Sequence, residues 1–242
     1  MKLVSINQPH YFPWLGLLDK IYRSDCFIVL DSVQYNKRGF QNRALYSIKN
    51  NKKWLTLPVY TKGYQQIALR IDQVKLAVSD APAKHFEVLR HRYHKAPGWQ
   101  RIESQLKEIM HRQTESLLDI VMKTMKLTLS VFEIERPIFF ASSFKPIHKK
   151  TMLMLELTQA VGASSYLSGV GAKAYMNEDI FKKKGVSIFY QNFHHPSYMQ
   201  LQSASFQKNC FALEWYLEDP DGAVEKFHLL AQSKHGIESN EH

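Results

Sequence analysis

The sequence predicts an α/β protein with a mostly parallel sheet flanked by helices. Short continuous apolar runs are typical of strands buried on both faces, and segments with helical periodicity separate them. The first of these elements follow the order strand, helix, strand, which implies parallel pairing with a right-handed crossover. The chain has 242 residues, of which 45% are hydrophobic and 22% charged, so it can form a substantial core.

The first strand–helix–strand unit lies at the N-terminus. Residues 2–6 read as a strand that ends before Pro9, which has no backbone N–H for a sheet hydrogen bond. A helix can begin at Pro13, because apolar residues recur at helical spacing from Trp14 onward. The run CFIVL, starting at Cys26, is typical of a buried strand.

The middle of the chain is polar at first and then helical. Residues 31–51 form a polar stretch that carries many cationic and amide side chains. Residues 53–60 and 66–71 are predicted as strands. From Pro82 the pattern becomes helical, with further helices over residues 99–110 and 116–132, so we expect a helical lobe at about residues 80–135.

The last third of the chain again alternates strands and helices. Strands are predicted at residues 136–141, 165–168 and 186–191, and a helix at residues 151–161 that ends at Gly162. The remainder is mixed, and the polar ending SKHGIESNEH is expected to be frayed. Because no linker marks a boundary, residues 1–242 are predicted to form a single domain.

Composition narrows the class of partner. The net charge of +10, from 32 Lys and Arg against 22 Asp and Glu, suits an anionic ligand. The positive residues are spread along the chain without a zinc-finger or RNP signature, so we expect a small phosphate-containing substrate rather than nucleic acid. No apolar run approaches the roughly 20 residues of a membrane span, and no signal peptide is recognisable, which favours the cytoplasm. Composition predicts neither a cofactor nor an oligomeric state.

Polar loops follow predicted strand ends, where ligands bind in open parallel sheets. In the loop after the first strand, His10 is a candidate acid or base because its ordinary pKa is near neutrality. The alternative is a histidine hydrogen-bonded to a turn carbonyl. Asp31 follows a buried strand and is the second catalytic candidate, with an Asx turn or a helix cap as its alternative.

A cluster of hydrogen-bond donors follows Asp31. Lys37, Arg38, Asn42 and Arg43 lie within seven positions, and guanidinium groups bind phosphate or carboxylate with two parallel hydrogen bonds. Most such clusters are solvated loops, but here aromatic and amide side chains are interleaved with the charges. That mixture favours a ligand with a sugar or flat part and a charged part.

Glycines and histidines near the other strand ends give weaker signals. Gly169 and Gly171 are candidates to present N–H groups to a phosphate, or simply to form a tight turn. The adjacent His194 and His195 point apart in an extended chain, so no metal site is expected.

Five motifs together resemble the WbqC-like family. They are NQPHYFPWLGLLDKI, LDSVQYNKRGFQNR, TLPV, YLSGVGAKAY and FHHPSYMQ, and the similarity spans about residues 1–217. The segment NCFALEWYLEDP matches the family's C-terminal pattern only loosely. The resemblance implies a role in bacterial surface-polysaccharide (O-antigen) biosynthesis, by acyl or aminoacyl transfer to nucleotide-linked amino sugars.

Carried over motif by motif, the resemblance implies a set of site residues. His10 and Asp31 are the catalytic candidates. The residues expected to bind substrate or anion are Gln8, Tyr11, Gln34, Tyr35, Lys37, Arg38, Asn42, Arg43, Tyr166, Ser168, Gly169, Gly171, Tyr175, Tyr198 and Gln200, with Pro196 in the same motif as the last two.

Three functions remain open at this point. The first is a transferase in which His10 or Asp31 acts as general base while Lys37, Arg38 and Arg43 hold phosphates. The second is an adenylate-forming nucleotidyltransferase or ligase, because His10 stands where the first histidine of a HIGH-type motif would, although no second histidine follows at the expected place. The third is a non-catalytic binding protein of a glycan-assembly complex, favoured by the absence of a complete catalytic constellation.

Overall fold

A parallel sheet forms the centre of the protein. A computed structural model describes residues 1–174, 176–201, 203–233 and 236–239. The strands β1 (Leu3–Asn7), β2 (Cys26–Val29), β5 (Ile138–Phe140), β6 (Ser165–Gly169) and β7 (Ser187–Gln191) are all parallel and lie in the order β5-β2-β1-β6-β7. The strand β8 (Ile237–Ser239) pairs antiparallel with β7 at the edge. The predicted α/β fold with a mostly parallel sheet is confirmed.

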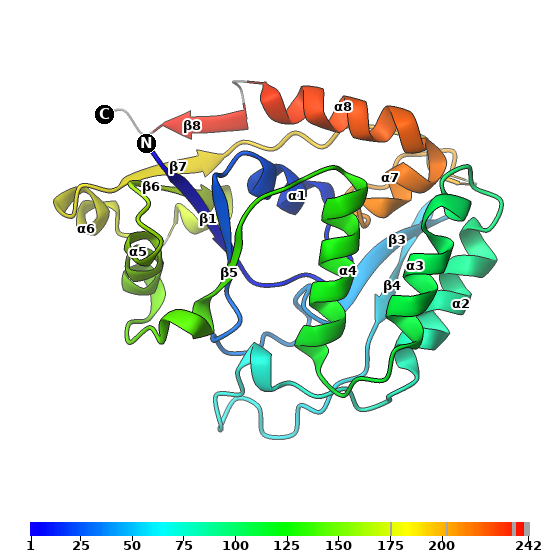
Figure 1. Ribbon diagram of the computed structural model, residues 1–242, viewed down its shortest axis with the longest axis horizontal. Helices are drawn as coiled ribbons and strands as arrows, with labels where there is room; N and C mark the ends of the chain where they lie inside the picture. Colours follow the sequence, from blue (N-terminus) through cyan, green and yellow to red (C-terminus); the bar gives the residue numbers. More distant parts are fainter. Residues whose placement is uncertain (175, 202, 234–235, 240–242) are drawn as a thin grey trace.

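Helices cover both faces of this sheet (Figure 1). On one face lies α1 (Leu15–Tyr22), and on the other lie α5 (Lys150–Ala160) and α6 (Glu178–Lys183). Side chains alternate along a strand, so Val4 and Ile6 of β1 join the core under α5 and α6. Ser5 and Asn7 therefore face α1.

A second layer of elements packs beyond α1. It contains a hairpin, β3 (Arg43–Ile48) with β4 (Asn51–Thr56), and the helices α2 (Ala81–Tyr93), α3 (Trp99–His111), α4 (Leu117–Val131), α7 (Leu213–Glu218) and α8 (Pro220–Gln232). One continuous apolar core joins these elements to α1 and β2. Short 3-10 turns complete the chain: η1 (Ile71–Gln73), η2 (Ala141–Phe144) and η3 (Val170–Ala172).

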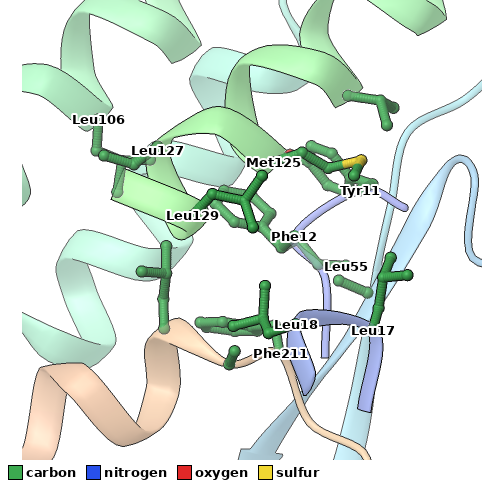
Figure 2. Packing of buried hydrophobic residues seen from close by; sticks show 14 of the residues in the cluster. Tyr11, Phe12, Leu17, Leu18, Leu55, Leu106, Met125, Leu127, Leu129 and Phe211 are labelled. Atoms are coloured by element: carbon green, nitrogen blue, oxygen red, sulfur yellow. The ribbon is translucent and has the colours of Figure 1, made fainter. Parts of the chain in front are cut away.

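The loop after β1 is held in place by two aromatic residues. Figure 2 shows Tyr11 and Phe12 inserted among side chains from α1, α4 and β4, with Phe211 beneath them. Both are at most 2% exposed. The N–H of Tyr11 donates to the carbonyl of Phe40 (2.9 Å), and that of Phe12 to Oγ1 of Thr124 (3.3 Å). The preceding residue, His10, is therefore fixed at the edge of the sheet.

The strand order reverses between β1 and β6. From β1 the chain moves to β2 and then β5 on one side, and then returns to β6 and β7 on the other side. In open α/β sheets, ligands bind in the crevice outside the carboxyl ends of the strands at such a switch point. The carboxyl ends of β1, β6 and β7 carry Asn7, Gly169 and Gln191.

One strand prediction is wrong, and one hairpin was not predicted. Residues 66–71 form turns, with the N–H of Ile67 bonded to the carbonyl of Gly63 and Ala68 at a φ of +47°. Only Arg70 pairs, in an isolated bridge with Gln34. Residues 43–51, for which the sequence analysis predicts no element, supply β3 and the start of β4, because Ala44 and Tyr46 alternate into the core.

The prediction for the C-terminal tail is wrong for three residues. Ile237–Ser239 pairs antiparallel with Phe189–Gln191, so that part is ordered by the edge of the sheet. Residues 234–235 and 240–242 of the predicted frayed tail lie outside the described residues. Within the described ranges, no helix combines the length and apolarity that crossing a membrane requires.

Candidate functional site

A cavity of about 310 Å³ lies at the switch point, and we call it the switch-point pocket. Its walls come from the carboxyl ends of β1, β6 and β7, from the start of α1, and from the loops that cover them. The lining residues are Asn7, His10, Trp14, Gly16, Leu17, Lys20, Phe40, Gly169, Gln191 and Asn209.

Lys20 is the cationic residue of this pocket. It is 4% exposed, and its Nζ donates to the carbonyl oxygen of Ile6 (3.0 Å) and to Oδ1 of Asn7 (3.5 Å). No Asp or Glu is among the residues that line the pocket in the described structure. Burial lowers the pKa of Lys20 from its usual 10.5 to about 8. Lys20 can therefore gain and lose a proton near neutral pH.

Asn7 links Lys20 to His10. Because Oδ1 of Asn7 accepts from Lys20, its Nδ2 is the donor, and it lies 3.4 Å from Nε2 of His10 and 3.0 Å from the carbonyl of Gln8. The unprotonated nitrogen of His10 is then Nε2, which assigns the ring proton to Nδ1. Nδ1 is buried and has no hydrogen-bond partner within the described residues.

His10 is uncharged at neutral pH. Burial first, and then the nearby cation of Lys20, lower the pKa of His10 to about 3. Its ring stacks on Phe40, with centroids 5.0 Å apart, and its backbone N–H contacts Sδ of Met125 at 3.4 Å. A neutral imidazole in this position is a hydrogen-bond donor through Nδ1 and a poor proton acceptor.

Gln191, at the end of β7, also lines the pocket. Its Nε2 donates to Oδ2 of Asp19 (2.6 Å) and to the carbonyl of Gly16 (2.8 Å), and both residues lie on α1. Asp19 is buried and also pairs with Arg23 (2.8 Å). These bonds fix the end of β7 against α1.

Trp14 needs a glycine beside it. A Cβ atom at Gly16 would lie 2.2 Å from the Trp14 ring, so the indole occupies the space that any other residue at this position would fill. The ring also makes an edge contact with Phe193, with centroids 5.5 Å apart. The glycine thus sets the position of the aromatic wall.

Two predicted residues of the β1 loop lie behind the pocket. Oε1 of Gln8 accepts from Nε2 of Gln41 (2.5 Å), which connects the β1 loop to the segment before β3. The hydroxyl of Tyr11 lies 2.9 Å from Nδ1 of His85. Both residues hold the loop that carries His10.

Asp31 does not line the switch-point pocket. It is 2% exposed, and its Oδ1 and Oδ2 accept hydrogen bonds from the N–H (2.9 Å) and Oγ (2.6 Å) of Ser142. This arrangement resembles the capping alternative raised from the sequence, because Ser142 lies in η2. A catalytic role for Asp31 stays a prediction.

The predicted anion cluster is divided between the surface and the hairpin. Lys37 and Arg38 are exposed, whereas Arg43 lies over Trp54 (3.9 Å) and donates to the carbonyls of Gly39 (3.2 Å) and Arg38. Asn42 is buried and donates from Nδ2 to the carbonyl of Leu57 (2.8 Å). Arg43 and Asn42 thus hold the 36–42 turn to the hairpin.

Gln34 and Tyr35 lie away from the switch-point pocket. Gln34 lines a separate cavity beyond β2, and Tyr35 is buried against Tyr64, with ring centroids 6.2 Å apart. Burial raises the pKa of Tyr35 to about 12. Tyr35 is a neutral core residue.

The residues predicted around β6 are distributed over both faces of the sheet. Gly169 lines the switch-point pocket, whereas Tyr166 packs on Phe181 in the core under α5 and α6 (5.9 Å between centroids). Ser168 is buried, and Gly171 lies in η3 outside the pocket. Tyr175 lies outside the described residues.

Tyr198 and Gln200 of the FHHPSYMQ motif pack against α7 and do not line the switch-point pocket. Tyr198 stacks on Trp215 (5.3 Å), and Nε2 of Gln200 donates to Oε2 of Glu214 (3.1 Å) and to the carbonyl of Gln207 (2.9 Å). Pro196 lies in the same segment, and its carbonyl is 2.8 Å from Nδ1 of His195. The motif organises a buried polar network.

Glu214 is the centre of that network and was not singled out from the sequence. It is fully buried, and its Oε1 accepts from the N–H of Ser47 (3.0 Å), Oγ of Ser47 (2.5 Å) and the hydroxyl of Tyr93 (2.6 Å). Its bonds join β3, α2 and the 198–201 segment, so it stabilises the wall behind the hairpin.

The sequence also missed Lys20 and Gln191. The available signal for Lys20 was its place in LGLLDKI, a short apolar helix with few charged residues, where a lysine on the sheet-facing side must be buried. No cluster of at least three His, Cys, Asp or Glu residues suited to a metal ion occurs in the described part of the chain.

Comparison with known proteins places these motifs in one family. The model of the WbqC-like protein family matches residues 8–214. The chain belongs to the WbqC-like protein family. An uncharacterized protein of Mycobacterium tuberculosis (strain ATCC 25618 / H37Rv), Rv1507c, is 27% identical over 189 residues, covering 78% of this chain and 81% of the relative. No solved structure matches this WbqC-like chain.

Proposed function

We propose that this WbqC-like protein is a transferase that adds an acyl or aminoacyl group to a nucleotide-linked amino sugar in bacterial surface-polysaccharide biosynthesis. Membership of the family supports the substrate class, through the resemblance described above. The position of the switch-point pocket supports a small-molecule site, because it lies where open parallel sheets bind their ligands.

Lys20 carries the proposal. It is a buried amine on the wall of the pocket, with a pKa of about 8. A general base works best when its pKa is close to the working pH, because it is then partly unprotonated and still basic. Its two hydrogen bonds go to Ile6 and Asn7, so the third position on Nζ is free to face an acceptor group.

In the proposed step, Lys20 accepts and returns the proton that moves during group transfer. The nitrogen or oxygen of the acceptor attacks the acyl carbon of an activated donor and forms the new bond. The bond from that carbon to its leaving group breaks, and the leaving group takes the electron pair. Neutral Lys20 takes the proton that the acceptor loses, and the resulting ammonium can return it to the leaving group.

His10 has a different part in this proposal. With a pKa of about 3 it is a weaker base than Lys20, but Nδ1–H is an unused donor. A donor held at a fixed position can stabilise negative charge on the acyl oxygen in the transition state. Stacking on Phe40 and the contact with Asn7 keep the imidazole in one orientation.

A panel assay tests this function. Purified protein is incubated with nucleotide-linked amino sugars and with acyl or aminoacyl donors, and products are identified by mass spectrometry. We expect one acceptor to gain the mass of the transferred group, with a rate that falls about 100-fold or more in Lys20→Met. The matched control is Lys107→Met, an exposed lysine of α3, which should retain the rate.

Two results would overturn the proposal. One is the absence of product from every acceptor and donor in the panel, which would favour a non-catalytic binding protein if an acceptor still binds. The other is release of pyrophosphate from a nucleoside triphosphate without group transfer, which would favour the adenylate-forming alternative.

A further inference from the structure

A second and larger cavity lies at the same edge of the sheet. Its volume is about 680 Å³, and it lies beyond the carboxyl ends of β2 and β5, between the 32–34 and 68–70 segments and the start of α5. We call it the basic cleft, because five of its lining residues, Arg70, Lys145, His148, Lys149 and Lys150, are basic.

The charge of the basic cleft is only partly neutralised. Arg70 pairs with Asp72, and His148 pairs with Glu156 (3.0 Å). Lys145, Lys149 and Lys150 form no ion pair within the described residues, and no acidic side chain lines the cleft there. Three unpaired ammonium groups around one concave surface attract an anion more strongly than lysines spread over a convex surface.

The loop that carries the lysines is held in a fixed shape. The carboxylate of Glu156 on α5 reaches back and accepts from the N–H groups of Ile147 (3.1 Å) and His148 (3.1 Å). Lys145 and Lys150 have φ values of +49° and +52°, a left-handed conformation that lysine rarely adopts. Strained backbone of this kind concentrates at ligand-binding sites.

Helix α5, which follows this loop, also favours an anion in the basic cleft. α5 is 11 residues long and begins at Lys150, and the side chain of its N-cap residue, Lys149, makes no capping hydrogen bond. Unbonded N–H groups and the helix dipole favour an anion at this end. Ser32, Gln34 and Ser142 add hydrogen-bonding groups on the opposite walls, and Val33 and Leu153 add apolar surface.

We propose that the basic cleft binds the phosphoryl or diphosphoryl group of a substrate. The cleft and the switch-point pocket lie along one sheet edge, separated by two to three strand spacings, roughly 10–15 Å. This inference rests on the proposed function only where it links the bound phosphate to the transferred group. It also moves the anion site from Lys37 and Arg38, which the sequence favoured, to the loop before α5.

Isothermal titration calorimetry at low salt tests the proposal with inorganic pyrophosphate, a nucleoside diphosphate and a sugar 1-phosphate as probes. We expect at least one probe to bind, with affinity falling at high salt because exposed charges are screened. The double variant Lys145→Gln/Lys149→Gln should bind that probe at least about tenfold more weakly. The exposed pair Lys107→Gln/Lys126→Gln on the lobe helices is the matched control.

The order of affinities identifies the source of the phosphate. If the nucleoside diphosphate binds more tightly than pyrophosphate, the phosphate belongs to a nucleotide. If the sugar 1-phosphate binds most tightly of the three, it belongs to a sugar phosphate. No binding of any probe, or equal binding by the double variant, would overturn the proposal. Lys20→Met separates the two proposals, because it should keep phosphate binding and lose transfer. The transfer rate of Lys20→Met therefore tests the proposed reaction, and the phosphate affinity of Lys145→Gln/Lys149→Gln tests the basic cleft.

Discussion

The Nζ of Lys20 lies 3.0 Å from the carbonyl oxygen of Ile6, so a helix lysine is bonded to the backbone of the central strand. This contact lies at the carboxyl end of β1, next to the point where the strand order reverses. A buried ammonium costs free energy unless it is well paired, and here only a carbonyl and an amide oxygen pair it. The protein retains a destabilising group at the place where its fold favours a ligand.

Lys20→Met should change how stability depends on pH. Between its folded pKa of about 8 and its usual 10.5, the folded state binds fewer protons than the unfolded state, so wild-type stability rises with pH. The wild type should gain about 2 kcal/mol relative to Lys20→Met between pH 7 and pH 9.5. Urea unfolding at both pH values measures this difference. A constant difference would show that Lys20 titrates normally.

Gly169→Val should narrow the switch-point pocket without loosening the fold. Gly169 has an extended backbone with a φ of −78°, and an added Cβ meets no atom within 4 Å. We expect a change in unfolding free energy within about 0.5 kcal/mol and a KM raised about tenfold or more. The matched control is Ser164→Val, at the exposed residue just before the start of the same strand. An unchanged KM in Gly169→Val would place the substrate elsewhere.

Asp31→Ala should lower the free energy of unfolding and have little effect on the transfer rate. Asp31 accepts two hydrogen bonds from Ser142, and losing bonds to a buried carboxylate costs about 2–3 kcal/mol. Ser142→Ala should cost less, and a double-mutant cycle should give a coupling energy of about 1 kcal/mol or more. Thermal and urea unfolding provide the measurements. If Asp31→Ala abolishes transfer with normal stability, Asp31 is the catalytic residue that the sequence predicted.

Glu214→Gln should destabilise the fold although the side chains have nearly the same shape. The new NH₂ group replaces either Oε2 or Oε1 of Glu214. At Oε2 it faces the Nε2 donor of Gln200, and at Oε1 it faces the N–H of Ser47 and the hydroxyl of Tyr93. Leaving buried donors unpaired costs about 2–4 kcal/mol. Urea unfolding measures the loss, with the exposed Glu225→Gln of α8 as the control. Equal stability of the two variants would mean that the network is dispensable.

The parallel sheet was predictable because its strands are short apolar runs with polar loops after them. The run from Cys26 is buried at every position, and Gly162 ends α5 with a φ of +66°, as the glycine signal predicts. The turn at residues 63–69 was not predictable, because Ile67, Leu69 and Ile71 alternate as in a strand although Ile67 is 66% exposed. Sequence periodicity shows which residues could be buried, but it does not show which segments have a neighbouring strand to pair with.

Sequence reasoning singled out some of the residues that line the switch-point pocket and did not find others. Of the residues that the sequence singled out, His10 in the loop after β1 and Gly169 at the end of β6 line this pocket. Lys20 and Gln191 were missed because each depends on a contact over long range, to Ile6 across the crossover and to Asp19 on α1. Charge density favoured Lys37 and Arg38, but Arg43 is occupied by backbone carbonyls and Trp54.

The pH dependence of the transfer rate tests the central claim that Lys20 is the base of the switch-point pocket. In the wild type, kcat/KM should rise with pH and level off above a pKa of about 8, because transfer needs the neutral amine. In Lys20→Met the residual rate should lack this ascending limb, while Lys107→Met should keep it. An identical limb in the wild type and Lys20→Met would contradict the account, since another group would then be the base.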